Sequence, residues 1–149
     1  MTFVAAEVEV EAPPERVWEV VGVPENLPQW DRHIAEVQDV PPGGLREGSV
    51  YVTVMQFLGV RTRVPSKVLE WEPPNRAVFR LKGVIDATVT TTVEPLPGER
   101  SRLRHEVDFH FRGGLLGEIA ARSLAMVGGA QYALRRGAIA QKRQVEEGR

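Results

Sequence analysis

The chain of 149 residues contains no cysteine. This absence excludes a disulfide framework, a thiolate zinc site, a redox pair of cysteines and a cysteine nucleophile. A chain without thiols fits a reducing compartment, and we expect a cytoplasmic protein.

An excess of charge of one sign and a long apolar run are also missing. Lysine and arginine number 19 against 20 acidic residues, so the chain lacks the basic footprint of a nucleic-acid binder. The uncharged stretch 123–134 is shorter than the ~20 apolar residues that cross a bilayer. The first residues carry glutamates where a signal peptide is basic. We therefore expect no nucleic acid partner, no membrane span and no secretion.

Motifs for cofactors are absent as well. The sequence holds no GxxxxGKS or GxxxxGKT loop, no GxGxxG stretch and no serine in a GxSxG turn. The segment from His105 to Phe109 begins like a zinc-protease motif, but phenylalanine stands where the second histidine is needed. Neither a metal ion nor a nucleotide is expected as a cofactor.

What the chain does contain is enough for one core. Glycine and proline, 14 and 11 residues, stay below the ~25–30% typical of low-complexity chains. A chain of this length can bury about 68–70% of its unfolded surface around one core. We expect a single globular domain over residues 1–149.

The first third predicts a strand followed by short helices. Residues 3–11 alternate valine and alanine with glutamate, which is typical of a half-buried strand. Pro14 opens a short helix over 14–21, because proline at the first helical position loses no hydrogen bond. A second helical turn is predicted over 25–30.

Residues 34–112 predict an antiparallel meander. Strand-like runs of about 8–12 residues are separated by glycine and proline turns. The run 34–40 is ambiguous, because its apolar residues Ile34, Val37 and Val40 recur every three positions. Pro65 indicates an edge position or a bulge. Strict alternation over 85–94 and 102–111 places His105 on the apolar face with Leu103 and Val107.

After Gly113 and Gly114 the apolar period changes to that of a helix. Small and apolar residues recur every three or four positions, which predicts one amphipathic helix of about 28–30 residues with a bend at Gly128 and Gly129. The predicted fold class is α+β: a curved antiparallel sheet of about seven strands around a long C-terminal helix, with two short helices after strand one.

This order resembles a known superfamily. The stretches Pro28–Asp31 (PQWD), Val68–Arg80 and Gly113–Gly117 are similar to those of START-like proteins with the helix-grip fold, and most similar to the polyketide cyclase/dehydrase and lipid-transport branch. The resemblance implies an apolar cavity between the sheet and the last helix. It transfers no catalytic residue.

The cavity has support from the residues themselves. Small residues on the helix, such as Ala120, would face large ones on the strands and leave a void, unless close approach of the helix fills it. Trp30 and Tyr51 could border the cavity or simply pack in the core. The candidate ligand-binding residues are Trp30, Tyr51, Phe79, Thr91, His105, Val107, Phe109, Leu116, Ala120 and Leu124.

His105 is the most informative of these residues. If Val93 pairs with Leu103, His105 lies opposite Thr91, and the imidazole either bonds that hydroxyl alone or also serves a ligand. Three functions stay open: a carrier of a lipophilic molecule, a cyclase or dehydratase that uses His105 as acid or base, and a domain for protein association. The expected partner is a lipid, quinone, polyketide or aromatic compound. The oligomeric state is open, with a homodimer as one option.

Overall fold

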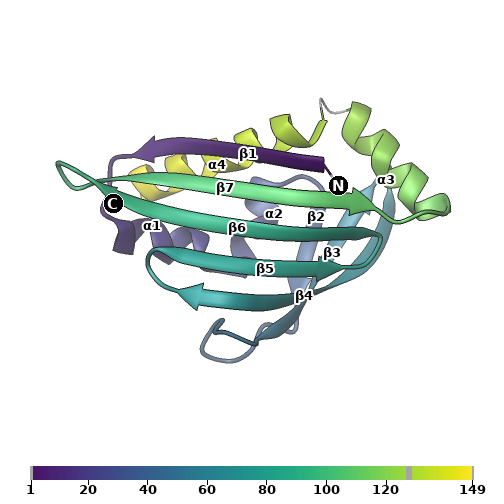
Figure 1. The fold of residues 1–149 in the computed structure, drawn as a ribbon, viewed down its shortest axis with the longest axis horizontal. Helices are drawn as coiled ribbons and strands as arrows, with labels where there is room; N and C mark the ends of the chain where they lie inside the picture. The colour runs from purple at the N-terminus through teal and green to yellow at the C-terminus, as the bar shows by residue number, and fades with distance from the viewer. Residues whose placement is uncertain (1, 127–128, 149) are drawn as a thin grey trace.

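A curved antiparallel sheet wraps around the last helix in the computed structural model, which describes residues 2–126 and 129–148 (Figure 1). The strand order is β1-β7-β6-β5-β4-β3-β2. The strands are β1 (Thr2–Val10), β2 (Ile34–Gln38), β3 (Val50–Phe57), β4 (Val60–Glu72), β5 (Arg76–Lys82), β6 (Ile85–Leu96) and β7 (Arg100–Phe111). The helices are α1 (Pro14–Val21), η1 (Pro24–Asn26), α2 (Leu27–Trp30), α3 (Leu115–Met126) and α4 (Gly129–Glu147).

The predicted α+β class and the helix-grip arrangement are confirmed. The short helices after strand one lie where proline and acidic residues predicted them, and α1 begins at Pro14. The ambiguous run 34–40 forms a strand, β2. Figure 1 shows α4 lying along β1, while α3 occupies the end of the sheet opposite α1.

The register of the longest hairpin follows the alternating pattern. Val93 pairs with Leu103, and Thr91 pairs with His105. Because side chains alternate between the faces of a strand, this register places Thr91 and His105 side by side on the concave face. Both are buried, so the predicted inward orientation of His105 is confirmed.

Pro65 lies inside β4 at a position with one strand neighbour. It pairs with Val52 of β3, whereas the pairing of β4 with β5 begins at Ser66. β4 is an interior strand of the sheet, and only on its β5 side does Pro65 lie at a local edge, where a missing N–H breaks no bond to β5. The irregularity between β4 and β5 lies further on, between Val68 and Glu70.

The prediction of one continuous C-terminal helix is wrong. The structure has two helices, α3 and α4, and Gly129 at the start of α4 has a φ of +85°. A left-handed residue cannot continue a right-handed helix, so the chain changes direction there. The predicted bend includes Gly128, which lies outside the described residues. The helix that the sheet grips is α4.

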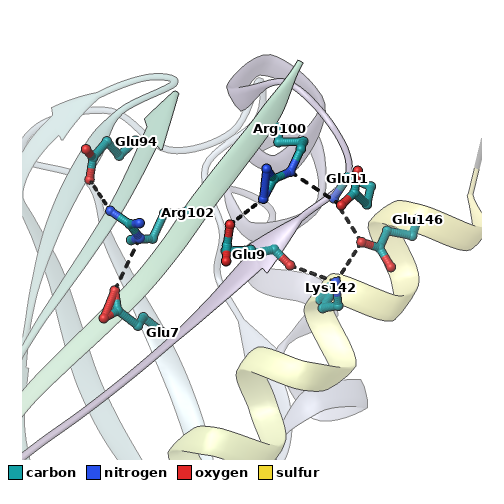
Figure 2. Close-up of polar contacts among 8 residues, drawn as sticks. All are labelled: Glu7, Glu9, Glu11, Glu94, Arg100, Arg102, Lys142 and Glu146. Carbon is teal, nitrogen blue, oxygen red and sulfur yellow. Dashed lines mark hydrogen bonds and ion pairs between the residues drawn. The ribbon is translucent and has the colours of Figure 1, made fainter. Parts of the chain in front are cut away.

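Charged side chains cover the convex face near β1 and β7. Figure 2 shows Arg100 between Glu9 and Glu11, and Arg102 between Glu7 and Glu94. Lys142 of α4 donates to the carbonyl oxygen of Glu9 at 2.7 Å and to the carboxylate of Glu146 at 2.8 Å. These contacts join the first strand to the last turns of α4. None of the helices described is long and apolar enough to cross a membrane.

Candidate functional site

An apolar cavity of about 230 Å³ lies between the concave face of the sheet, the segment from α1 to α2, and α4. Strands β5, β6 and β7 form its floor, and residues 133–141 of α4 form its roof. Small residues border it on both sides, namely Ala87 of β6 and Gly137 and Ala138 of α4. Because these side chains are short, the sheet and the helix leave space between them.

A second apolar hollow of about 110 Å³ adjoins the first toward α3. Met55, Ile85 and Leu134 line both spaces. Phe109 and Leu124 line only the smaller one. The space under the sheet therefore continues from α1 toward α3 along the concave face.

The structure brings eight of the ten predicted residues to these hollows. Trp30, Tyr51, Phe79, Thr91, His105 and Val107 line the larger space, and Phe109 and Leu124 line the smaller. The other two predicted residues, Leu116 and Ala120, line neither space. Leu116 is 44% exposed, and Ala120 is fully buried among core residues without lining either space. Both residues lie on α3, which is separate from the helix that covers the cavity.

A chain of hydrogen bonds crosses the inner end of the larger cavity. His105 Nδ1 lies 2.9 Å from the Thr91 hydroxyl, and His105 Nε2 lies 2.5 Å from Gln141 Oε1. The amide oxygen only accepts, so Nε2 carries the proton and the Thr91 hydroxyl donates to Nδ1. Burial lowers the pKa of His105, while the hydrogen bond to Gln141 opposes that shift. The ring is therefore a neutral imidazole with both nitrogens occupied.

Two aromatic side chains contribute polar atoms to the cavity region. Tyr51 is 4% exposed, and burial raises the pKa of its phenol, so the hydroxyl stays protonated and can donate. Trp30 donates from Nε1 to Gln144 Oε1 at 2.8 Å. This bond fixes the indole between α2 and α4, where it borders the cavity.

Sequence reasoning missed a second, more polar site beside the cavity. A cleft of about 330 Å³ lies between α2, residues 31–33 and α4. His33 is 4% exposed in its wall, and Asp31 Oδ1 accepts from the His33 backbone N–H at 2.8 Å and contacts Nδ1 at 3.1 Å. The Asp-x-His spacing is the available signal, because an aspartate side chain often accepts from the N–H two residues on.

The histidine and acidic side chains of the described residues do not gather into one cluster. Residues 2–126 and 129–148 contain no group of three or more histidine or acidic side chains that could hold a metal ion. The three histidines lie in different places: His105 under the sheet, His33 beside α2, and His110 on the convex face near Asp86.

The family model for polyketide cyclase/dehydrase and lipid-transport proteins matches residues 1–146. The chain belongs to this family. An uncharacterized member of the proteome of Mycobacterium tuberculosis is 31% identical over 127 residues, which cover 83% of this chain and 89% of that protein. The START-like resemblance seen in the sequence is therefore confirmed.

Proteins of solved structure with the same fold differ in the activity that their names state. A START superfamily protein from Mycobacterium smegmatis has a TM-score of 0.69 at 17% identity and covers 99% of each chain. The Zhui aromatase/cyclase from a Streptomyces species has a TM-score of 0.71 at 18% identity and covers 99% of this chain and 92% of its own. The protein TTHA0849 from Thermus thermophilus has a TM-score of 0.73 at 21% identity and covers 99% of each chain. At these identities the likeness shows the family's fold alone.

Proposed function

We propose that this protein binds a compact lipophilic molecule in the cavity between the sheet and α4, and that it does so without catalysis. The observation that carries the proposal is the apolar cavity of about 230 Å³ with small residues on both walls. Native cores rarely keep voids larger than a water molecule. A space of this size is best explained by a ligand.

The volume limits the size of the ligand. An apolar cavity of ~150 Å³ can hold benzene, whereas sites for drug-sized molecules span ~300–1,000 Å³. A space of about 230 Å³ therefore suits a ligand of one or two rings or a short chain. A long acyl chain would need the adjoining hollow of about 110 Å³ as well.

The arrangement of polar atoms supports binding over catalysis. A general acid or base needs a nitrogen within reach of the substrate, but Thr91 and Gln141 occupy both nitrogens of His105. The Tyr51 hydroxyl in the cavity wall is a better candidate for orienting a polar group of the ligand. In this proposal His105 shapes the cavity and does not transfer protons.

A cyclase or dehydratase is the second candidate. It is favoured by the aromatase/cyclase descriptions of two similar structures, Zhui and the di-domain protein BexL. His105 would then have to leave Gln141 to act as a base. Turnover of a poly-keto substrate that the His105→Gln variant loses would favour this candidate over simple binding.

The proposal is tested by filling the cavity. Naphthalene binding is measured by calorimetry and by the rise in melting temperature that ligand binding produces. The Ala138→Leu variant places extra carbons in the cavity, so we expect naphthalene binding to be lost while the melting temperature without ligand changes little. The control is Ala121→Leu, at an exposed position of α3, which should bind naphthalene like the native protein.

A second variant protects the test against a folding failure. Ala87→Leu fills the same space from the sheet side, and it replaces Ala138→Leu if the helix variant is unstable. Absence of naphthalene binding to the native protein, or unchanged binding to a folded cavity-filled variant, would overturn the proposal.

A further inference from the structure

The polar cleft beside the cavity carries more positive than negative charge. Its charged wall residues include two guanidinium groups, Arg32 and Arg136, and one carboxylate, Asp31. Neither arginine forms an ion pair within the part of the chain that the structure describes. Asp31 already accepts from the backbone and side chain of His33. The cleft is therefore left with unpaired guanidinium donors.

The position of Arg136 is defined by an aromatic neighbour. Its guanidinium carbon lies 5.9 Å from the ring centre of Tyr132, one helical turn earlier on α4. A cation over an aromatic ring is attracted by the ring face, which favours this orientation of the side chain. Tyr132 and Arg136 line the cleft together.

A buried polar atom in the wall lacks a partner. His33 Nε2 is buried and has no hydrogen bond among the described residues. Most buried polar groups in native proteins are paired, so an unpaired nitrogen calls for an explanation. Because His33 Nδ1 donates its proton to Asp31, Nε2 presents a lone pair, and the missing partner is a hydrogen-bond donor. His33 lines both the cleft and the smaller apolar hollow, which places that donor where the polar and apolar spaces meet.

The cleft and the larger apolar cavity share part of their walls. Trp30, Asp31 and Ala133 line both spaces. A molecule with an apolar body in the cavity would therefore have its polar end beside these residues, facing the two arginines. The two spaces together have the chemistry of a site for an amphiphile.

We propose that the cleft binds the carboxylate of the ligand, so that the ligand class is an aryl or short alkyl carboxylate whose apolar part occupies the neighbouring cavity. The forked guanidinium group matches the two oxygens of a carboxylate. Two arginines and one aspartate give the cleft a net charge of about +1. A ligand with a single negative charge neutralises it, which favours a carboxylate over a doubly charged phosphate ester. This inference rests on the binding function proposed above.

The experiment compares two ligands that share one ring system. 2-Naphthoate and 2-naphthalenemethanol differ in the charge of their polar group, and calorimetry at low salt measures both affinities. We expect the native protein to prefer 2-naphthoate about tenfold, because charge-assisted hydrogen bonds exceed neutral ones in strength. The preference should shrink in 1 M salt, which screens exposed charges.

Substitution of one arginine then locates the site. Arg136→Gln should reduce the affinity for 2-naphthoate about fivefold and leave that for 2-naphthalenemethanol unchanged, because only an exposed charge contact is lost. The matched control is Arg135→Gln, the neighbouring exposed arginine of α4 outside the cleft, which should keep the native preference. Arg32→Gln tests the opposite wall and should resemble Arg136→Gln.

The outcomes separate the two proposals. If neither naphthalene derivative binds, the proposed binding function itself fails. If both bind equally well, or if Arg135→Gln lowers the preference as much as Arg136→Gln, the carboxylate site is overturned while the apolar cavity stands.

Discussion

The protonation and hydrogen bonding of the His105 imidazole depend on two residues, one near it in the sequence and one distant. Thr91 faces it across the β6–β7 hairpin, and Gln141 reaches it from α4, 36 residues later. The first contact follows from strand alternation, and the sequence predicted it. The second depends on how α4 crosses the sheet, which no local pattern specifies. The neutral imidazole with a hydrogen bond at each nitrogen therefore depends on both the strand register and the position of α4.

This burial gives His105 a measurable effect on stability. Burial lowers the pKa of His105 in the folded protein, whereas an unfolded histidine titrates near ~6.5. Below that pH the unfolded chain binds a proton that the folded protein does not, so stability falls as the pH falls. We expect the native protein to lose up to about 1.4 kcal/mol per pH unit relative to His105→Gln between pH 6.5 and 5. Urea unfolding at pH 7.5, 6 and 5 measures this difference.

The difference in unfolding free energy between the native protein and His105→Gln at higher pH distinguishes this effect from a simple loss of packing. At pH 7.5 His105→Gln should cost on the order of 1 kcal/mol, because the amide can still donate a hydrogen bond to Gln141. The control His110→Gln alters a half-exposed histidine on the convex face and leaves the effect of His105 in place. Parallel pH profiles for the native protein and His105→Gln would show that His105 is not held neutral by burial.

Among the elements, α3 shows how a local pattern can mislead. The apolar period over residues 115–138 is continuous enough to predict one helix, but the left-handed backbone at Gly129 separates α3 from α4. None of the residues of α3 then lines the larger cavity, although Leu124 lines the smaller hollow. This explains why Leu116 is exposed and why Ala120 packs in the core instead of lining the ligand space.

A glycine fixes the start of α3. A Cβ atom on Gly117 would lie 1.7 Å from the carbonyl oxygen of Arg112, and such overlap requires movement of the backbone. We expect Gly117→Ala to cost about 1–3 kcal/mol of unfolding free energy, measured by urea unfolding. Gly113→Ala is the matched control, because nothing lies within 4 Å of its Cβ position. Equal stability of the two variants would mean that α3 does not begin as described.

At the scale of the whole molecule, the sheet holds α4 by two different means. Buried apolar residues such as Val10, Leu103 and Val145 pack beneath the end of the sheet. Along the edge of the sheet that β1 forms, charged side chains of β1 and β7 and the last turns of α4 form the contacts shown in Figure 2. The apolar contacts account for most of the stability, because exposed ion pairs contribute ~0–1 kcal/mol each.

The charged contacts should therefore be weak and sensitive to salt. Arg100→Gln removes the ion pairs to Glu9 and Glu11, and we expect a loss below about 1 kcal/mol at low salt that disappears in 1 M salt. Arg61→Gln is the control, since the described residues provide no ion pair for this exposed arginine. A loss of several kcal/mol that persists in high salt would show that the network supports the fold directly. Chemical unfolding in urea at two salt concentrations measures both variants.

The sequence by itself determined the fold class, the strand register around His105, and the short helices over 14–21 and 25–30. These features follow from local rules: alternation in strands, glycine and proline at turns, and proline at the start of a helix. Six of the ten predicted residues lie on strands and border the two hollows for the same reason, because alternation reveals which side chains of a strand face inward.

Only the tertiary structure decided which helix covers the cavity and what lies beside it. The contact of Gln141 with His105 and the cleft between α2 and α4 join residues more than 30 positions apart. Such contacts depend on the direction in which α4 leaves Gly129 and crosses the curved sheet. A periodic pattern identifies the face that a residue occupies but not the element that packs against it.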